Sequence, residues 1–187
     1  MLFLLRCFRL SFLALLILPT YAAVGQTCKT TILPTTDHLV DHYDGTISDP
    51  KTGLIWKKCS EGQSYSQSTN DCTNNTNSYN WQAALEQAQA INNGDGQNFG
   101  EIDWRVPNIN ELGSIVELSC FGQAISQSMF PNTPAGGYWS SSPAVDSNNY
   151  QYLSWILNFS TGYSYTYSRS YDGSGYGGAG GYVRLVR

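Results

Sequence analysis

Four cysteines have the type and spacing that most directly suggest chemistry: Cys28, Cys59, Cys72 and Cys120. The fifth, Cys7, lies in an N-terminal segment that we expect to be removed as a signal peptide on export. An even number of cysteines in an exported chain predicts two disulfides, for which three pairings are possible. Cys59 and Cys72 flank a loop rich in Ser, Gln and Asn, which favours a local pair and leaves Cys28 to reach Cys120. A zinc site is the alternative, but no two of the four have the close spacing of zinc ligands.

A second candidate group combines two histidines with two aspartates: His38, Asp41, His42 and Asp44. Histidines four residues apart share one face of a helix and could hold a metal there. Turn-forming and β-type residues flank this segment, so we interpret both histidines as surface residues. Residues 92–101 resemble a calcium loop in their alternating oxygen side chains, but they lack its acidic series and are predicted to form a glycine-rich connector. We therefore expect no metal or other cofactor.

Catalytic residues are not indicated by any motif in the chain. Serines are abundant, yet no G-x-S-x-G motif occurs, and the cysteines are expected to be paired. Asp103 and Glu111 are better explained as a loop residue and a helix cap, although acid-base chemistry by paired carboxylates stays open. We predict that the protein is not an enzyme.

Tyrosines alternate with small hydroxylated residues in the segment "YSYTYSR", residues 163–169. The last 50 residues hold 9 of the 13 tyrosines. Such a run forms either a structural aromatic ladder or a binding surface, because Tyr offers a large contact area with a hydroxyl at its tip. We predict a binding surface that is at least partly exposed. The candidate ligand-binding residues are Tyr150, Tyr152, Ser154, Asn158, Ser160, Tyr163, Tyr165, Tyr167, Arg169, Tyr171 and Tyr176.

A pair of antiparallel strands must position these residues. Alternation over residues 152–159 predicts one strand, residues 160–162 a turn, and residues 163–169 its partner. Leu153, Trp155, Leu157 and Phe159 share one face, which we expect to pack on the helices with Trp155 buried. The tyrosines then lie on the other face.

Two helices are predicted before these strands. The first covers residues 80–94, with Asn80 as its cap, and the second follows Asn108, which forms a capping pair with Glu111. Trp104 is expected in the core, with Arg105 paired inside the fold. Residues 172–181 are predicted to form a loop, and residues 182–187 a final strand. The predicted fold class is α+β, with two helices packed on an antiparallel sheet and a C-terminal β-meander.

The N-terminal segment indicates export. Arg6 and Arg9 precede the apolar run 10–19, which predicts a signal peptide over residues 1–22, with a retained anchor as the alternative. Residues 23–38 are expected to form a loose leader arm before a domain at residues 39–187. The processed chain has 8 basic and 14 acidic residues, which argues against nucleic acid and anionic membranes as partners. We expect a periplasmic, cell-surface or secreted protein of bacterial type.

Five ordered motifs carry a resemblance to a known family. They are "GTISDPKTGLIWKKCSEGQS", "YNWQAALEQAQAIN", "DWRVPNINELGSIVELSC", "MFPNTPAGGYWSSSP" and "YVRLVR". Together they resemble the Lcl C-terminal domain family over residues 39–187. The resemblance implies a C-type-lectin-like fold, related to retroelement-diversified variable proteins and to formylglycine-generating enzymes.

The same resemblance implies an extracytoplasmic binding or adhesion module whose partner is a protein or glycan on another cell or surface. Calcium-dependent sugar binding is not implied, because the chain has "RVPN" in place of an acid-Pro-Asn loop and has no Trp-Asn-Asp strand. An enzyme of the formylglycine-generating type is the alternative, although no cysteine follows Cys120. Retroelement diversification would place variable residues between 147 and 176, held by Trp139, Trp155, Phe159 and Val183.

Overall fold

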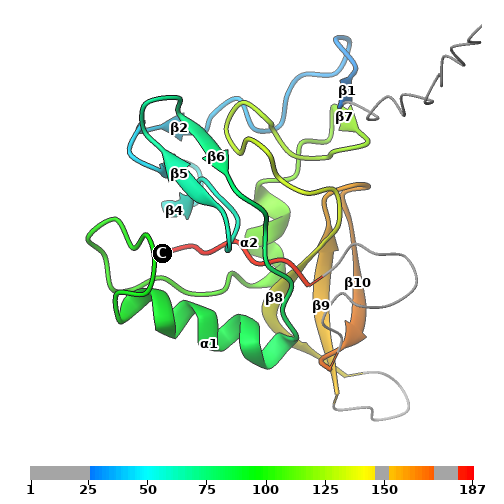
Figure 1. Ribbon diagram of the computed structural model, residues 1–187. Helices are drawn as coiled ribbons and strands as arrows, with labels where there is room; N and C mark the ends of the chain where they lie inside the picture. Colours follow the sequence, from blue (N-terminus) through cyan, green and yellow to red (C-terminus); the bar gives the residue numbers. More distant parts are fainter. Residues whose placement is uncertain (1–25, 146–151, 171–180) are drawn as a thin grey trace, which may run out of the picture.

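The computed structural model describes residues 26–145, 152–170 and 181–187 (Figure 1). These residues form two helices and a series of short strands, which sit in small antiparallel sheets. Their bounds are β1 Thr27–Cys28, β2 Val40–Asp41, β3 Thr46–Asp49, β4 Leu54–Lys57, β5 Ser64–Ser66, β6 Asp71–Thr73, α1 Trp81–Asn92, α2 Ile109–Ser114, β7 Cys120–Phe121, β8 Gly137–Ala144, β9 Leu153–Asn158 and β10 Tyr163–Ser168.

The largest strands form the predicted C-terminal meander, in the order β10-β9-β8. A second three-stranded sheet has the order β2-β3-β4, and two further pairs join β1 to β7 and β5 to β6. Every one of these pairings is antiparallel. The α+β class with antiparallel sheets is therefore confirmed, although the strands are divided among several small sheets.

Both helices begin at the predicted caps. The Asn80 side chain accepts a hydrogen bond from the Ala83 backbone N–H at 2.8 Å. Asn108 accepts from the backbone N–H of Glu111, whose carboxylate accepts from the Asn108 N–H at 2.7 Å. These reciprocal bonds form a capping box and satisfy donors that a helix start otherwise leaves unpaired.

The β8–β9 pair is buried on both faces, whereas one packed face was predicted. Tyr138 lies opposite Leu157, and both pack in the apolar cluster that includes the buried side chains of α2. Trp139 lies opposite Ile156, and both pack in the cluster that includes the buried side chains of α1. Since neighbouring residues of a strand point to opposite faces, the two helices cover opposite faces of this sheet.

The prediction that Trp155 is buried is wrong, because its side chain is only half-buried. Leu157 and Phe159, on the same face, are 3 % and 0 % exposed. The six residues of α2 span about 9 Å. The helix thus covers the Leu157 end of β9 and leaves Trp155, further along the strand, partly open.

The C-terminal segment 181–187 runs through the middle of the fold and is not the regular strand that was predicted (Figure 1). Val186 makes single bridges to both Trp56 and Arg105. The backbones of Ile55 and Arg187 exchange hydrogen bonds of 2.9 Å in both directions. This segment contacts different neighbours along its length, so no continuous ladder forms, but it joins β4 to the rest of the core.

The leader arm is fastened to the domain from residue 26 onward, which corrects the expectation of a loose segment. Cys28 in β1 is bonded to Cys120 in β7. Further along the arm, the backbone N–H groups of Thr35 and Thr36 donate to the Glu117 carboxylate at 3.1 Å each. The arm therefore packs as part of the folded unit.

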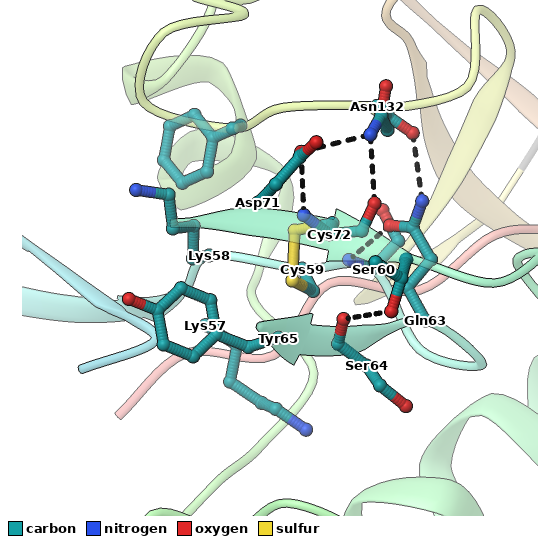
Figure 2. The surroundings of a disulfide bond; sticks show 12 residues. Lys57, Lys58, Cys59, Ser60, Gln63, Ser64, Tyr65, Asp71, Cys72 and Asn132 are labelled. Atoms are coloured by element: carbon teal, nitrogen blue, oxygen red, sulfur yellow. Dashed lines mark hydrogen bonds between the residues drawn. A yellow bond between two sulfur atoms is a disulfide. The ribbon is translucent and has the colours of Figure 1, made fainter. Parts of the chain in front are cut away.

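Both predicted disulfides are present, Cys28–Cys120 and Cys59–Cys72. The second connects the segment after β4 to the β5–β6 hairpin (Figure 2). The Asn132 side chain donates to the Cys72 carbonyl at 2.8 Å and to the Asp71 carboxylate at 2.9 Å. The hairpin is thus held by a covalent bond on one side and by Asn132 on the other.

Candidate functional site

The β9–β10 hairpin brings the tyrosines of the C-terminal region together. Its register places Tyr163 opposite Asn158, Tyr165 opposite Ile156, and Tyr167 opposite Ser154. Because directly opposite residues share one face of a sheet, all three tyrosines lie on the face that also carries Ile156. This is the side on which α1 packs, through the cluster that contains Ile156 and Trp139.

We call Tyr163, Tyr165 and Tyr167 the Tyr face. Their exposed fractions are 76 %, 37 % and 40 %. The rings of Tyr165 and Tyr167 meet edge to face, with centroids 6.2 Å apart and planes at 73°. The prediction that this ladder is at least partly exposed is confirmed.

A glycine in β8 makes room for the Tyr face. A Cβ atom at Gly137 would lie 2.7 Å from Cδ1 of Ile156 and 3.3 Å from the Tyr165 hydroxyl. The absent side chain therefore lets Ile156 pack closely and lets Tyr165 reach across β9 toward β8. Sequence reasoning missed Gly137, since nothing in its neighbours marks it as a contact position.

The turn of the hairpin uses two of the candidate ligand-binding residues for its own structure. The Asn158 side-chain oxygen accepts from the Ser160 backbone N–H at 2.7 Å and from the Ser160 hydroxyl at 2.6 Å. Gly162, with φ of +78°, completes the turn by donating its N–H to the Asn158 carbonyl at 2.7 Å. The turn at 160–162 is as predicted, and it fixes where Tyr163 begins β10.

Arg169 and Ser154 hold the other end of the hairpin. The Arg169 Nε donates to the Leu153 carbonyl at 3.0 Å and to the Ser154 hydroxyl at 2.9 Å. Ser154 is fully buried, so its side chain supports Arg169 from beneath the Tyr face and is not presented to solvent. The Arg169 guanidinium also lies 4.3 Å from the centroid of the Trp81 ring, at the start of α1.

The remaining candidates lie around the hairpin. Tyr152, just before β9, is 74 % exposed. Tyr150, Tyr171 and Tyr176 lie outside the described residues.

The Tyr face carries no charge of its own. Residues 153–168, which contain β9, the turn and β10, include no Asp, Glu, Lys or Arg. Solvent therefore meets rings and hydroxyl groups in this region, which suit contacts to neutral surfaces with scattered hydrogen-bonding groups.

The residues considered for metal binding do not converge. His42 is exposed, as predicted, but the prediction that His38 is a surface residue is wrong, because its side chain is only 15 % exposed. Its Nε2 lies 3.1 Å from Asp49 Oδ1. Within the described ranges, no group of three or more His, Cys, Asp or Glu side chains is placed to hold a metal ion.

Trp104 and Arg105 divide between core and surface. Trp104 is 2 % exposed, as predicted. The Arg105 side chain is 46 % exposed and makes a bidentate pair with Glu111 at 2.7 and 2.8 Å, so it is paired as expected but lies on the surface. Its hydrogen bonds lower the pKa of Glu111 and so keep the helix cap ionised.

The comparison with known families agrees with the motifs in the sequence. A family model described as the Lcl C-terminal domain matches residues 45–187, which include every element from β3 to the C-terminal segment. No curated protein matches the chain. The match includes both helices, the disulfide-linked hairpin and the Tyr face, so this chain belongs to the Lcl C-terminal domain family.

Proposed function

We propose that this protein is a ligand-binding module that recognises its partner through the Tyr face. The observation that carries the proposal is the exposure of three tyrosines on one face of the charge-free β9–β10 hairpin. Closely spaced exposed aromatic groups of this kind are typical of interaction surfaces. Binding is proposed over the enzymatic alternative because the face supplies contact area and hydrogen bonds, which are what recognition requires.

Buried residues on both faces of β8 and β9, next to the Tyr face, support this role. Trp139, Ile156 and Phe159 are each 0–1 % exposed and hold β8 and β9 in place. A packed frame under an exposed surface lets surface residues change while the fold is kept, and it reduces the entropy lost on binding. Val183, which is fully buried, belongs to the same frame.

The partner that this surface fits is a neutral or weakly charged protein or glycan on another cell or surface. We further propose that the arrangement is C-type-lectin-like. Two helices on opposite faces of a central sheet, together with a C-terminal segment that bridges back to β4, support that assignment. The two disulfides are compatible with an exported protein. Within the described ranges, no helix is long and apolar enough to cross a membrane.

An array of glycans and cell-surface proteins tests the proposed function. The test variant replaces Tyr163, Tyr165 and Tyr167 with Ser, and the control variant replaces Ser164 and Thr166, on the opposite face of β10, with Ala. We expect the wild type and the control to bind the same array members and the Tyr variant to bind none of them. Equal binding by the Tyr variant would place the site elsewhere.

We also propose that the residues around the Tyr face vary between strains through retroelement diversification. The frame residues Trp139, Phe159 and Val183 are fully buried, whereas Tyr152 and Tyr163 are exposed, so substitution is tolerated at the second group and not at the first. Sequencing the last 50 codons from sister strains tests this. Changes concentrated at codons for exposed residues, with Asn replaced by Tyr, Ser, Asp or Gly, support it, and an invariant region opposes it.

A further inference from the structure

A polar pocket lies between the β5–β6 hairpin, α1 and the loop after α1, and it shares no residue with the Tyr face. Its volume is about 310 Å³, at the lower end of the range for small-molecule sites. The side chains that matter for the argument are Lys57, Glu61, Ser64, Gln87 and Asp95.

Lys57 is the feature that points to a ligand. Its side chain is only 6 % exposed, and its ammonium group donates to Glu61 Oε1 at 2.6 Å. The ring of Phe99 lies 5.8 Å from the nitrogen. Among the described residues, Glu61 is the only hydrogen-bond acceptor for an ammonium that carries three N–H groups. Since buried donors are normally satisfied, the remaining N–H groups are left to bond to whatever occupies the pocket, water or a ligand.

Other groups that line the pocket can also make further hydrogen bonds, as acceptors or as donors. The Gln87 amide nitrogen donates to Glu61 Oε2 at 3.0 Å, which leaves the Gln87 side-chain oxygen as an acceptor. The Ser64 hydroxyl accepts from Asn74 at 3.3 Å and keeps its own hydrogen to donate. The Asp95 carboxylate adds further acceptors. Both donors and acceptors therefore line one small space.

The charges in the pocket define the class of ligand. Glu61 offsets Lys57, and Asp95 adds one negative charge, so an anion gains no net attraction. A hydroxyl group both donates and accepts, so several hydroxyls on one carbon skeleton can bond to a mixed set of donors and acceptors. We propose that this pocket binds one neutral polyhydroxylated group, a sugar ring or a short polyol, with Lys57 as its principal donor.

Titrations followed by ¹H–¹⁵N NMR test the proposal. The probes are D-glucose and N-acetyl-D-glucosamine as sugars, glycerol as a polyol, and sodium sulfate as an anion, each at millimolar concentration. We expect a sugar or glycerol to shift the amides of Gly62, Ser64 and Gly96, which line the pocket, and sulfate to leave them unchanged. Comparing the sugar titrations with the glycerol titration distinguishes a sugar site from a polyol site. No shift from any neutral probe, or a larger shift from sulfate, overturns the proposal.

A matched pair of variants locates the binding. Ser64→Trp fills the pocket, whereas Ser66→Trp places the same bulk on the same strand but outside the pocket. We expect Ser64→Trp to weaken binding by about tenfold or more and Ser66→Trp to leave it within about twofold. Unchanged binding by a folded Ser64→Trp variant overturns the assignment. The variant with Tyr163, Tyr165 and Tyr167 replaced by Ser should bind the probe normally. A negative result for the pocket is therefore distinct from a negative result for the proposed function of the Tyr face.

Discussion

The guanidinium of Arg169 lies 4.3 Å from the centroid of the Trp81 ring. The backbone N–H of Trp81 donates to the Arg169 carbonyl at 3.0 Å, and the Trp81 ring nitrogen donates to the Ser140 carbonyl at 2.8 Å. The start of α1 is thereby joined to both β8 and the end of β10. This contact fixes one end of the hairpin that carries the Tyr face.

Replacing Arg169 with Ala should destabilise the protein by about 2 kcal/mol, because it removes the stacking on Trp81 and the hydrogen bonds to Leu153 and Ser154. Urea unfolding measures the loss. Arg169→Lys keeps the charge but not the planar group, and it should recover only part of the stability. Full stability in both variants would show that the contact does not hold the hairpin.

Replacing the buried Arg184 with Met should cost about 3 kcal/mol or more. Arg184 is fully buried and donates to the carbonyls of Lys57 and Lys58 and to the hydroxyls of Ser60 and Thr133. Met fills similar space but leaves these acceptors without their donor. Thermal or urea unfolding reports the difference.

The exposed Arg105 supplies the matched control for this measurement. Its side chain is 46 % exposed, and its pair with Glu111 lies at the surface. Arg105→Met should therefore cost about 1 kcal/mol or less. Equal losses at the two arginines would contradict the central position of Arg184 in the core.

Stability should fall in acid through Glu117, which holds the leader arm. Burial alone would raise the pKa of Glu117, but hydrogen bonds from Ser119, Thr36 and Thr35 outweigh it and lower the pKa to about 2. A carboxyl whose pKa is lower in the folded state stabilises the fold above its unfolded value of 4.5 and loses that contribution as the pH falls toward 2.

Comparison of the wild type with Glu117→Gln isolates this contribution. The variant should be less stable by on the order of 2 kcal/mol at neutral pH, and the difference should shrink between pH 4.5 and 2. Other carboxylates, such as Asp41 and Asp49, also have lowered pKa values, so only the difference between the two proteins is informative. A difference that is constant with pH would exclude Glu117 as the titrating group.

Removing the Cys59–Cys72 disulfide by double substitution to Ala should cost about 3 kcal/mol, as expected for a loop of 13 residues. The hydrogen bonds of Asn132 to Asp71 and Cys72 remain, so the hairpin should stay near its place. Non-reducing peptide mapping of the wild type checks the pairing. Cys28 linked to Cys59, or free thiols, would contradict it.

Much of the fold could be predicted from sequence where the signal is local. The caps at Asn80 and Asn108 depend on side chains that bond to their own helix, and the turn at 160–162 depends on Asn158 and Gly162 in the same way. The alternation of tyrosines also identified the exposed face. Such features need only residues near in sequence.

The errors arise where distant segments decide the outcome. Alternation in β9 could not show that α2 would cover Leu157 but leave Trp155 half-buried, or that Ile156 would pack toward α1. Ser154 was grouped with the binding residues because its alternation matches theirs, yet Arg169 covers it. The pocket at Lys57 and Glu61 depends on α1 packing beside the β5–β6 hairpin, and no local sequence pattern predicts that contact.

The most direct test of the account is the affinity of the Tyr-face variant for the strongest partner found on the array, measured with the immobilised partner and checked against the thermal unfolding midpoint. Replacing Tyr163, Tyr165 and Tyr167 with Ser removes exposed side chains, so stability should change by about 1 kcal/mol or less per site. Affinity should fall by about a hundredfold or more, while the Ser164→Ala, Thr166→Ala control stays within about twofold of the wild type. A folded triple variant that binds like the wild type, or a triple variant that unfolds, would contradict the account.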